Sequence, residues 1–486
     1  MQLVDFFKTL VMFCFTCVSF ITNAGYFSQV RDFVKEHPKA TIAVGAGVAA
    51  VALWYTKIYY SKTEEERRQW KDNKLYCGYR QLSDVKKNKY INNLDQFKLV
   101  MGISENDFVN LNEEDKKKFI DKDQKVFIPH VWVTKPLWRT LYFSRKKVLS
   151  PCNSNKKYPY GDFRVDAFGK HYQREYSCGV CGGLTFNIIE KGNKNNTSSV
   201  DIISLISKPK YNGAFVQVAS RFNCLEGKGR GVSHYTDSRQ GFAQGESVAT
   251  ATLPASIYRY YFLSSKKIND SGINLLQSVI DKKDMKYGLP TTDCYTSIAN
   301  YDWGKQSDNE EDKEWWRSIR IGLHTEVTPI LTDISPKGPA NVEARITNNH
   351  GQQVTLVLTS ALNLSNSRIG HIANLNKAKG KKKEKINTKE NLETFAKGCL
   401  MASYHYTLSA ASQRVKETSS RQKVLLTMMG GGVFENKTQW IVDAIQKSLE
   451  AHRNNSIDVI LILYTTPEQD IMNQLYGLQD QYKNIY

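Results

Sequence analysis

Apolar residues follow two different periods along the C-terminal two thirds of this 486-residue chain. Short runs rich in Val, Ile and Leu predict buried strands at 184–189, 214–219, 319–324, 354–359, 424–427 and 459–464. Apolar residues that recur every three or four positions predict helices at 246–262, 273–281, 391–412 and 438–452. Strands and helices that alternate in this way indicate an α/β fold with a mixed, mostly parallel sheet flanked by helices.

Three consecutive glycines, Gly430, Gly431 and Gly432, separate the predicted strand at 424–427 from the helix at 438–452. Residues without side chains let backbone amides approach an oxygen-rich ligand closely, and a helix N-terminus adds partial positive charge. In open parallel sheets ligands lie beyond the carboxyl ends of the strands, where this loop falls. The pattern predicts a diphosphate site, although the same glycines also suit an ordinary tight turn.

Polar residues also follow the predicted strand at 214–219. Asn223 lies a few residues beyond it, and Gln244 and Glu246 open the next helix. These positions fall where the site of a parallel α/β sheet is assembled. For Glu246 the alternative is a simpler role, in which its charge stabilises the N-terminus of the helix.

The chain is strongly basic, with a formal net charge of +19 and a sequence pI near 9.3. Such a charge favours anionic partners, namely phosphate-bearing ligands, nucleic acid or an acidic membrane surface. The lysines are densest at 377–385, which we interpret as a solvated loop. Nucleic-acid binding stays an alternative that no motif favours.

The N-terminus contains two apolar segments. Residues 9–24 resemble a signal peptide or an anchor. Residues 40–56 contain no charge and end in aromatic residues, which predicts a transmembrane helix, the alternative being a buried helix rich in Ala and Gly. We therefore expect a membrane localisation, through a single pass or a hairpin anchor, with the side of the membrane left open because basic residues flank both ends.

Composition shifts divide the chain into three parts. Residues 1–62 hold the signal or anchor and the transmembrane segment, 63–170 form a helical stalk that is rich in loops, and 171–486 form the α/β domain with inserts. The nine cysteines are irregularly spaced and describe no disulfide framework. Cys178 and Cys181 lack a second pair for zinc, so neither a metal nor a cofactor is predicted.

Two segments of the chain resemble the macrodomain and poly(ADP-ribose) glycohydrolase superfamily. The first segment is the strand and loop at 216–223, and the second is the strand, glycine loop and Asn at 426–436. The resemblance as a whole covers residues 177–464. The resemblance implies a macrodomain-like fold in which Asn223 lies near the distal ribose and the glycine loop holds the diphosphate. The candidate ligand-binding residues are Asn223, Gln244, Gly430, Gly431, Gly432, Val433, Phe434 and Asn436.

The chain departs from the hydrolytic members of that superfamily, which carry a glycine-rich loop after the Asn and an adjacent acidic pair. Here the corresponding candidates for the general acid and base are the separate carboxylates Glu226 and Glu246. We predict a membrane-tethered protein that binds ADP-ribose or a related nucleotide diphosphate and hydrolyses ADP-ribosyl linkages. The alternatives are a non-catalytic ADP-ribose reader and a basic nucleic-acid-binding membrane protein.

Overall fold

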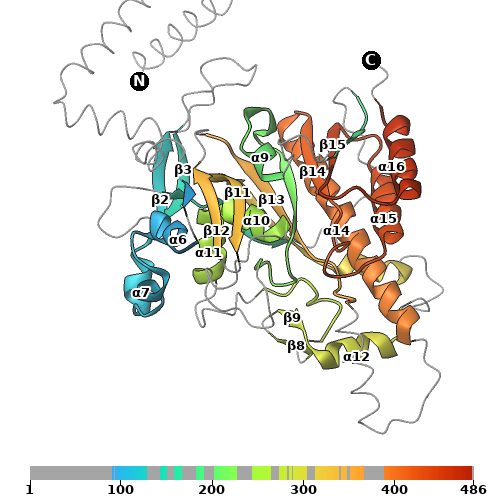
Figure 1. Cartoon of the computed structure of the whole chain (residues 1–486), viewed down its shortest axis with the longest axis horizontal. Coiled ribbons are helices and arrows are strands. Elements are labelled where there is room, and N and C mark those ends of the chain that lie inside the picture. Colours follow the sequence, from blue (N-terminus) through green and yellow to red (C-terminus); the bar gives the residue numbers. More distant parts are fainter. Residues whose placement is uncertain are drawn as a thin grey trace, which may run out of the picture. The chain divides into compact units, whose positions relative to one another are not determined.

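The computed structural model describes residues 90–91, 93–127, 143–149, 158–166, 182–190, 202–226, 244–263, 273–281, 284–286, 288–303, 312–338, 341–346, 351–365 and 388–483. The chain divides into two compact units. One comprises Met1–Asp84 and Asp123–Lys146, and the other Val85–Lys122 and Lys147–Tyr486. The second unit contains the central sheet and both loops that the sequence predicts to bind a ligand (Figure 1).

The central sheet has seven strands in the order β5-β10-β13-β7-β14-β15-β6. Their bounds are β5 Asp162–Asp166, β6 Thr185–Glu190, β7 Phe215–Ala219, β10 Ile321–Val327, β13 Val354–Thr359, β14 Gln422–Thr427 and β15 Ile457–Leu463. The five strands from β13 to β6 run parallel, whereas β10 is antiparallel to both β13 and β5. The predicted mixed, mostly parallel sheet is therefore confirmed.

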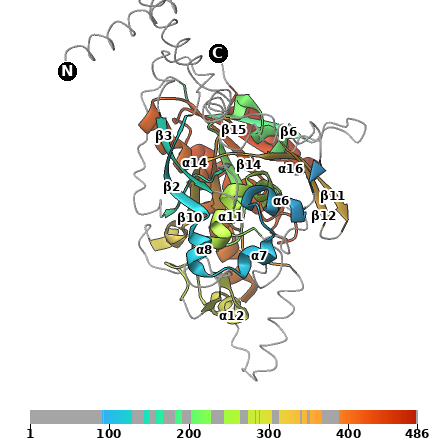
Figure 2. The ribbon, with the colours of Figure 1, turned by 90° about the vertical axis from the view of Figure 1, so that its left-hand side faces the viewer.

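The middle strands are buried along most of their length because helices cover both faces of a parallel sheet. The long helix α14 (Thr388–Thr418) packs on β7, β14 and β15, and α15 (Thr438–Ala451) lies beside it. Helix α16 (Gln469–Gln481) packs on α15 and β6, and α12 (Thr292–Asn300) on α14. Helix α10 (Gln244–Ala251) packs on β7 and on the short helices α9 (Ile202–Ile206) and α11 (Leu253–Tyr261) (Figure 1). Figure 2 shows α11 beside α6 (Asn93–Met101).

The shorter elements lie outside the central sheet. Of the three small helices that precede it in the chain, two pack an aromatic side chain against α11, because Phe97 and Phe108 both contact Tyr261. The bounds of the remaining elements are α6 Asn93–Met101, α7 Glu105–Val109, α8 Glu113–Lys117, β1 Tyr90–Ile91, β2 Ile120–Phe127, β3 Phe143–Leu149, β4 Tyr158–Pro159, β8 Met285–Lys286, β9 Leu289–Pro290, β11 Leu331–Gly338, β12 Asn341–Ile346, η3 Pro209–Tyr211 and η5 Asp312–Ser318.

All six predicted strands are present, as are the helices predicted at 391–412 and 438–452. The helix predicted at 246–262 is interrupted at Thr252, because Pro254 at the start of α11 lacks the amide that a continuous helix needs. The prediction of a helix at 273–281 is wrong, since these residues form turns. Leu275 instead donates to Phe222 O and accepts from Arg320 N, so tertiary contacts take the groups that a helix would use.

Within the described ranges, no helix is both long enough and apolar enough to cross a bilayer. The predicted transmembrane segment at 40–56 and the apolar segment at 9–24 lie outside the described residues.

Candidate functional site

The two central parallel strands separate towards their carboxyl ends. β7 and β14 are in register as far as Val216 and Leu425, whereas β14 stays paired with β15 up to Thr427. Beyond that point the amide of Thr427 donates to the side-chain Oε1 of Gln217, at 3.2 Å, in place of a backbone carbonyl. A side chain therefore fills the space where the two strands diverge, at the edge of the sheet where α/β proteins place their ligands.

Gln244, the first residue of α10, binds the end of β7 through both ends of its side-chain amide. Its Nε2 donates to Gln217 O at 2.9 Å, and its Oε1 accepts from Ala219 N at 2.7 Å. Ser220 N donates to Thr359 O of β13, and backbone groups alternate between the two edges of a strand, so Gln244 occupies the edge of β7 that faces β14. Gln244 was predicted to bind a ligand, and that role stays a prediction.

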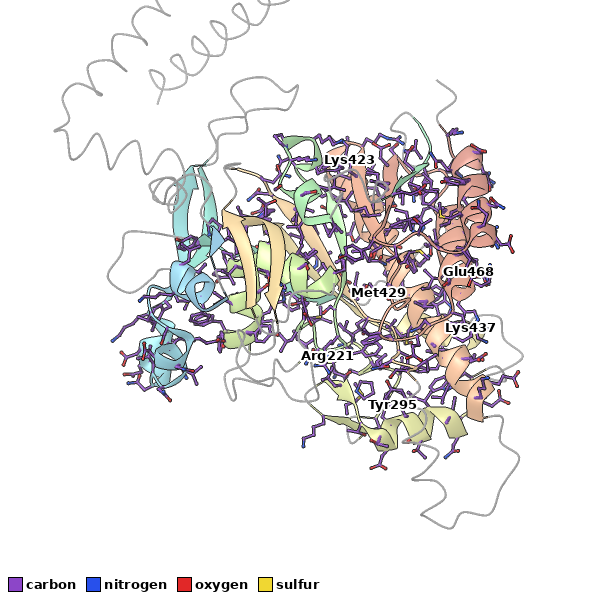
Figure 3. All side chains as sticks on the ribbon, in the orientation of Figure 1. Arg221, Tyr295, Lys423, Met429, Lys437 and Glu468 are labelled. Atoms are coloured by element: carbon purple, nitrogen blue, oxygen red, sulfur yellow. The ribbon has the colours of Figure 1, made fainter. Side chains whose placement is uncertain are left out.

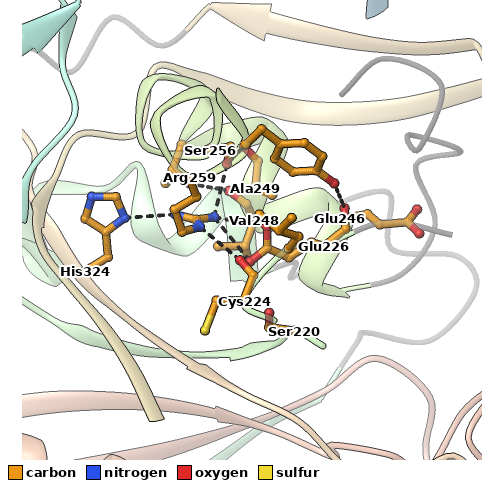
Figure 4. A network of polar contacts seen from close by, with 12 residues as sticks. Ser220, Cys224, Glu226, Glu246, Val248, Ala249, Ser256, Arg259 and His324 are labelled. Atoms are coloured by element: carbon orange, nitrogen blue, oxygen red, sulfur yellow. Dashed lines mark hydrogen bonds and ion pairs between the residues drawn. The ribbon is translucent and has the colours of Figure 1, made fainter. Parts of the chain in front are cut away.

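The first turn of α10 lies directly against the end of β7. A Cβ atom at Gly245 would be 2.0 Å from Ala219 O, so only glycine permits this approach. The next residue, Glu246, is 5% exposed. Figure 4 shows its carboxylate pointing away from Arg259.

The glycine loop is fixed at its base by Gly430 and Asn436. Gly430 has a φ of +80°, a left-handed conformation that favours glycine, and a Cβ there would lie 2.7 Å from Ala361 Cβ. Asn436 N donates to Gly430 O at 3.0 Å, and Asn436 Nδ2 donates to Leu362 O at 2.9 Å. Asn436 is buried, so its contacts show a role in shaping the loop, and direct ligand binding by Asn436 stays a prediction.

The tip of this loop projects into solvent. Gly432 and Val433 are exposed, Val433 at 80%, and Phe434 is partly buried against the core. Within the described part of the chain, the amides of Gly430, Gly432, Val433 and Phe434 donate no hydrogen bond. The loop therefore presents several backbone donors close to the N-terminus of α15.

Tyr404 of α14 braces the chain just before the glycines. Its hydroxyl donates to Thr427 O at 2.7 Å and accepts from Met429 N at 2.9 Å. Gly431 N donates to Met428 O, which closes the following turn. Tyr404 is fully buried, and burial raises the pKa of its hydroxyl, so the hydroxyl stays protonated and can donate.

The loop after β7 has a tight, buried conformation. Asn223 is fully buried, and its Oδ1 accepts from Leu225 N at 3.1 Å. Cys224 adopts a φ of +57°, which is uncommon for a residue with a side chain. Burial, followed by the charge of Glu226, raises the pKa of the Cys224 thiol, while Arg259 acts in the opposite direction. The thiol is therefore neutral and unreactive.

Glu226 forms a buried ion pair with Arg259 of α11 (Figure 4). Arg259 Nη2 lies 3.2 and 3.0 Å from the two carboxylate oxygens, and both side chains are 0% exposed. Arg259 Nε also donates to Cys224 O at 3.2 Å, and its Nη1 lies 2.9 Å from His324 Nδ1. The carboxylate of Glu226 is thus fully engaged in holding the loop after β7.

The predicted residues follow two neighbouring parallel strands or open the helix that packs on the end of β7, so they lie at the same edge of the sheet. Lys423 lies near the start of β14, whereas Arg221 and Met429 follow the ends of β7 and β14. Figure 3 shows Arg221 and Met429 on the side of the sheet away from Lys423. No role at the site was predicted for Gln217, Arg259 or Tyr404. A lone arginine in the apolar helix α11 was the one usable indication, because arginine is rarely fully buried unless it is paired.

No cluster of metal-ligating side chains occurs among the residues that the structure describes. Cys178 and Cys181 lie outside them.

Among known proteins, similarity to this chain is found with solved structures but not with family models or curated sequences. The similar structures are poly(ADP-ribose) glycohydrolases. The enzyme from Deinococcus radiodurans in complex with ADP-ribose matches over 67% of this chain and 95% of its own, with 12% identity and a TM-score of 0.34. The enzyme from Thermomonospora curvata matches over 66% and 85%, with 10% identity and a TM-score of 0.31. This is the superfamily that the sequence motifs resemble.

Proposed function

We propose that this chain binds ADP-ribose or a related nucleoside diphosphate where β7 and β14 diverge. The observation that carries the proposal is the exposed glycine loop, whose amides at Gly430, Gly432, Val433 and Phe434 donate no hydrogen bond within the described residues. Diphosphate oxygens accept hydrogen bonds from such amides and gain from the partial positive charge at the N-terminus of α15.

The neighbouring residues suit the other parts of such a ligand. Phe434 in the loop and Tyr464 after β15 offer aromatic surface, and Tyr464 is 61% exposed. Aromatic rings stack on nucleobases irrespective of the base. Asn223 and Glu246, on the side of β7, are polar groups of the kind that bind ribose hydroxyls.

Hydrolysis of an ADP-ribosyl linkage is the second candidate function. It requires a carboxyl group placed against the glycosidic oxygen. Glu226 is poorly suited because both of its oxygens bind Arg259. Glu246 is the better candidate, since it lies in the turn of α10 that packs on the end of β7 and points away from Arg259.

The membrane anchor remains a prediction, because the segments that carry it lie outside the described residues. Binding of nucleic acid remains an alternative based on net charge alone.

Titration calorimetry on the full-length chain with ADP-ribose and ADP tests the proposal. A Cβ at Gly432 meets no atom within 4 Å, so Gly432→Asp adds a negative charge beside the amides without a clash. We expect it to weaken ADP-ribose binding at least about tenfold, roughly 1.4 kcal/mol, through repulsion of the diphosphate.

Two controls isolate the charge at the loop. Gly432→Asn has nearly the same shape without the charge, and Gly477→Asp places the charge at another position with open space, on α16. Both are expected to retain affinity. Absence of ADP-ribose binding by the unmodified chain, or equal affinity of the Asp and Asn variants, would disprove the proposal.

A further inference from the structure

The side chain of Gln244 takes the place of a strand on the edge of β7. A neighbouring parallel strand would donate to Gln217 O and accept from Ala219 N, and Gln244 does both, at 2.9 and 2.7 Å. On the other side of the gap, the Gln217 side chain accepts from Thr427 N of β14. Two glutamine side chains thus satisfy the backbone groups that β7 and β14 expose where they part.

This arrangement differs from the usual cap of a helix N-terminus. A capping side chain binds amides of its own first turn, whereas the bonds of Gln244 reach residues 25 and 27 positions earlier in the chain. Gly245 adds to the same contact, because its lack of a side chain lets the helix turn touch Ala219 O. The first turn of α10 is therefore fixed to β7 by two hydrogen bonds and a close backbone contact.

We infer that Gln244 is a positioning residue, which holds the first turn of α10 between the ends of β7 and β14 and thereby sets the distance from Glu246 to the glycine loop. The inference rests on the proposed function. The glycine loop has separate supports, Tyr404 and Asn436, neither of which bonds Gln244. Loss of Gln244 is therefore expected to affect the part of the ligand beyond the diphosphate more than the diphosphate itself.

The experiment compares ADP with ADP-ribose on full-length variants by calorimetry. In Gln244→Leu, we expect ADP affinity to stay within about twofold of the unmodified chain and ADP-ribose affinity to fall about tenfold. Gln244→Glu keeps the acceptor for Ala219 N, and its affinity for ADP-ribose is expected to fall only about threefold. The matched control is Gln413→Leu, at an exposed position of α14. The side-chain amide of Gln413 bonds only Glu417 among the described residues.

The outcomes separate this inference from the proposed function. If the unmodified chain binds neither nucleotide, both fail together. If it binds both and Gln244→Leu does so equally well, only the inference fails. An equal loss of affinity for ADP and for ADP-ribose in either variant also overturns the inference, because the effect would then not be confined to the part of the ligand on the β7 side. Should Gln244→Leu fail to fold by circular dichroism, Gln244→Glu decides with the same two ligands.

Discussion

Arg259 donates from Nη2 to both carboxylate oxygens of Glu226, and neither side chain is exposed to solvent. Removing one partner of a buried pair leaves an uncompensated charge in a place that water cannot reach. We expect Glu226→Gln and Arg259→Met each to lower the free energy of unfolding by about 3 to 5 kcal/mol, measured by urea denaturation.

The double variant distinguishes an ion pair from two independent packing residues. Replacing both charges, in the double variant that combines Glu226→Gln with Arg259→Met, removes the buried charge altogether and is expected to recover part of the loss. Strict additivity of the two single changes would show that the pair is not coupled.

Gly430 and Gly432 of the glycine loop differ in whether they can accept a side chain. At Gly430, alanine would have to adopt a φ of +80° and would lie 2.7 Å from Ala361 Cβ, so we expect Gly430→Ala to cost about 2 to 4 kcal/mol. Gly432→Ala meets no atom and should change stability by less than about 0.5 kcal/mol. Thermal unfolding of the two variants side by side checks the contrast, and a similar Tm for both would contradict it.

Two buried histidines predict a loss of stability in acid. Burial lowers the pKa of His452 to about 4, against the opposing effect of its bond to Ser448 O. Burial, then His452 and Arg317, hold the pKa of His405 well below its usual value, and the two rings lie 4.7 Å apart. In the unfolded chain both histidines would take up a proton near pH 6.5.

The unfolded state thus binds protons that the folded state excludes, and stability falls as pH falls. The contribution of His452 is fully present above about pH 6.5 and is lost between that value and pH 4, by roughly 3 kcal/mol. Urea denaturation from pH 7 to 4.5 measures the slope. His452→Phe is expected to flatten it, and an unchanged slope would assign the acid sensitivity to other groups.

Glu246→Gln separates a reader of ADP-ribose from a hydrolase. The change keeps the size of the side chain but removes a group able to transfer a proton, so turnover of an ADP-ribosylated substrate should drop by about 100-fold or more while ADP-ribose affinity is retained. Chromatographic detection of released ADP-ribose measures turnover. If the unmodified protein releases none yet binds ADP-ribose, the reader is supported. Equal turnover in the variant would remove Glu246 from the mechanism.

Several features were predictable because their causes are local. The apolar run of β14, the glycines after it and the helical period of α15 adjoin in the chain, and each limits the conformation of its own residues. The strands of the parallel sheet were found for the same reason, since burial on both faces requires an unbroken apolar run.

The roles of single side chains at the site were less predictable. Glu226 and Glu246 are equivalent carboxylates in the sequence, yet only Glu226 is engaged by Arg259, which lies 33 positions further along the chain. The helix expected at 273–281 was wrong because Leu275 bonds the loop after β7 and the residue before β10. No periodicity within the segment could reveal either partner.

The sequence alone determined six strands of the central sheet, the helices α14 and α15, the glycine loop and its place at the end of a buried strand, because these depend on neighbouring residues. Only the tertiary structure decided that β7 and β14 part near Gln217, that the side chains of Gln217 and Gln244 bind the backbone groups exposed there, and that Glu226 belongs to a buried ion pair. Those choices depend on which backbone groups and charges remain to be satisfied once distant segments are packed together.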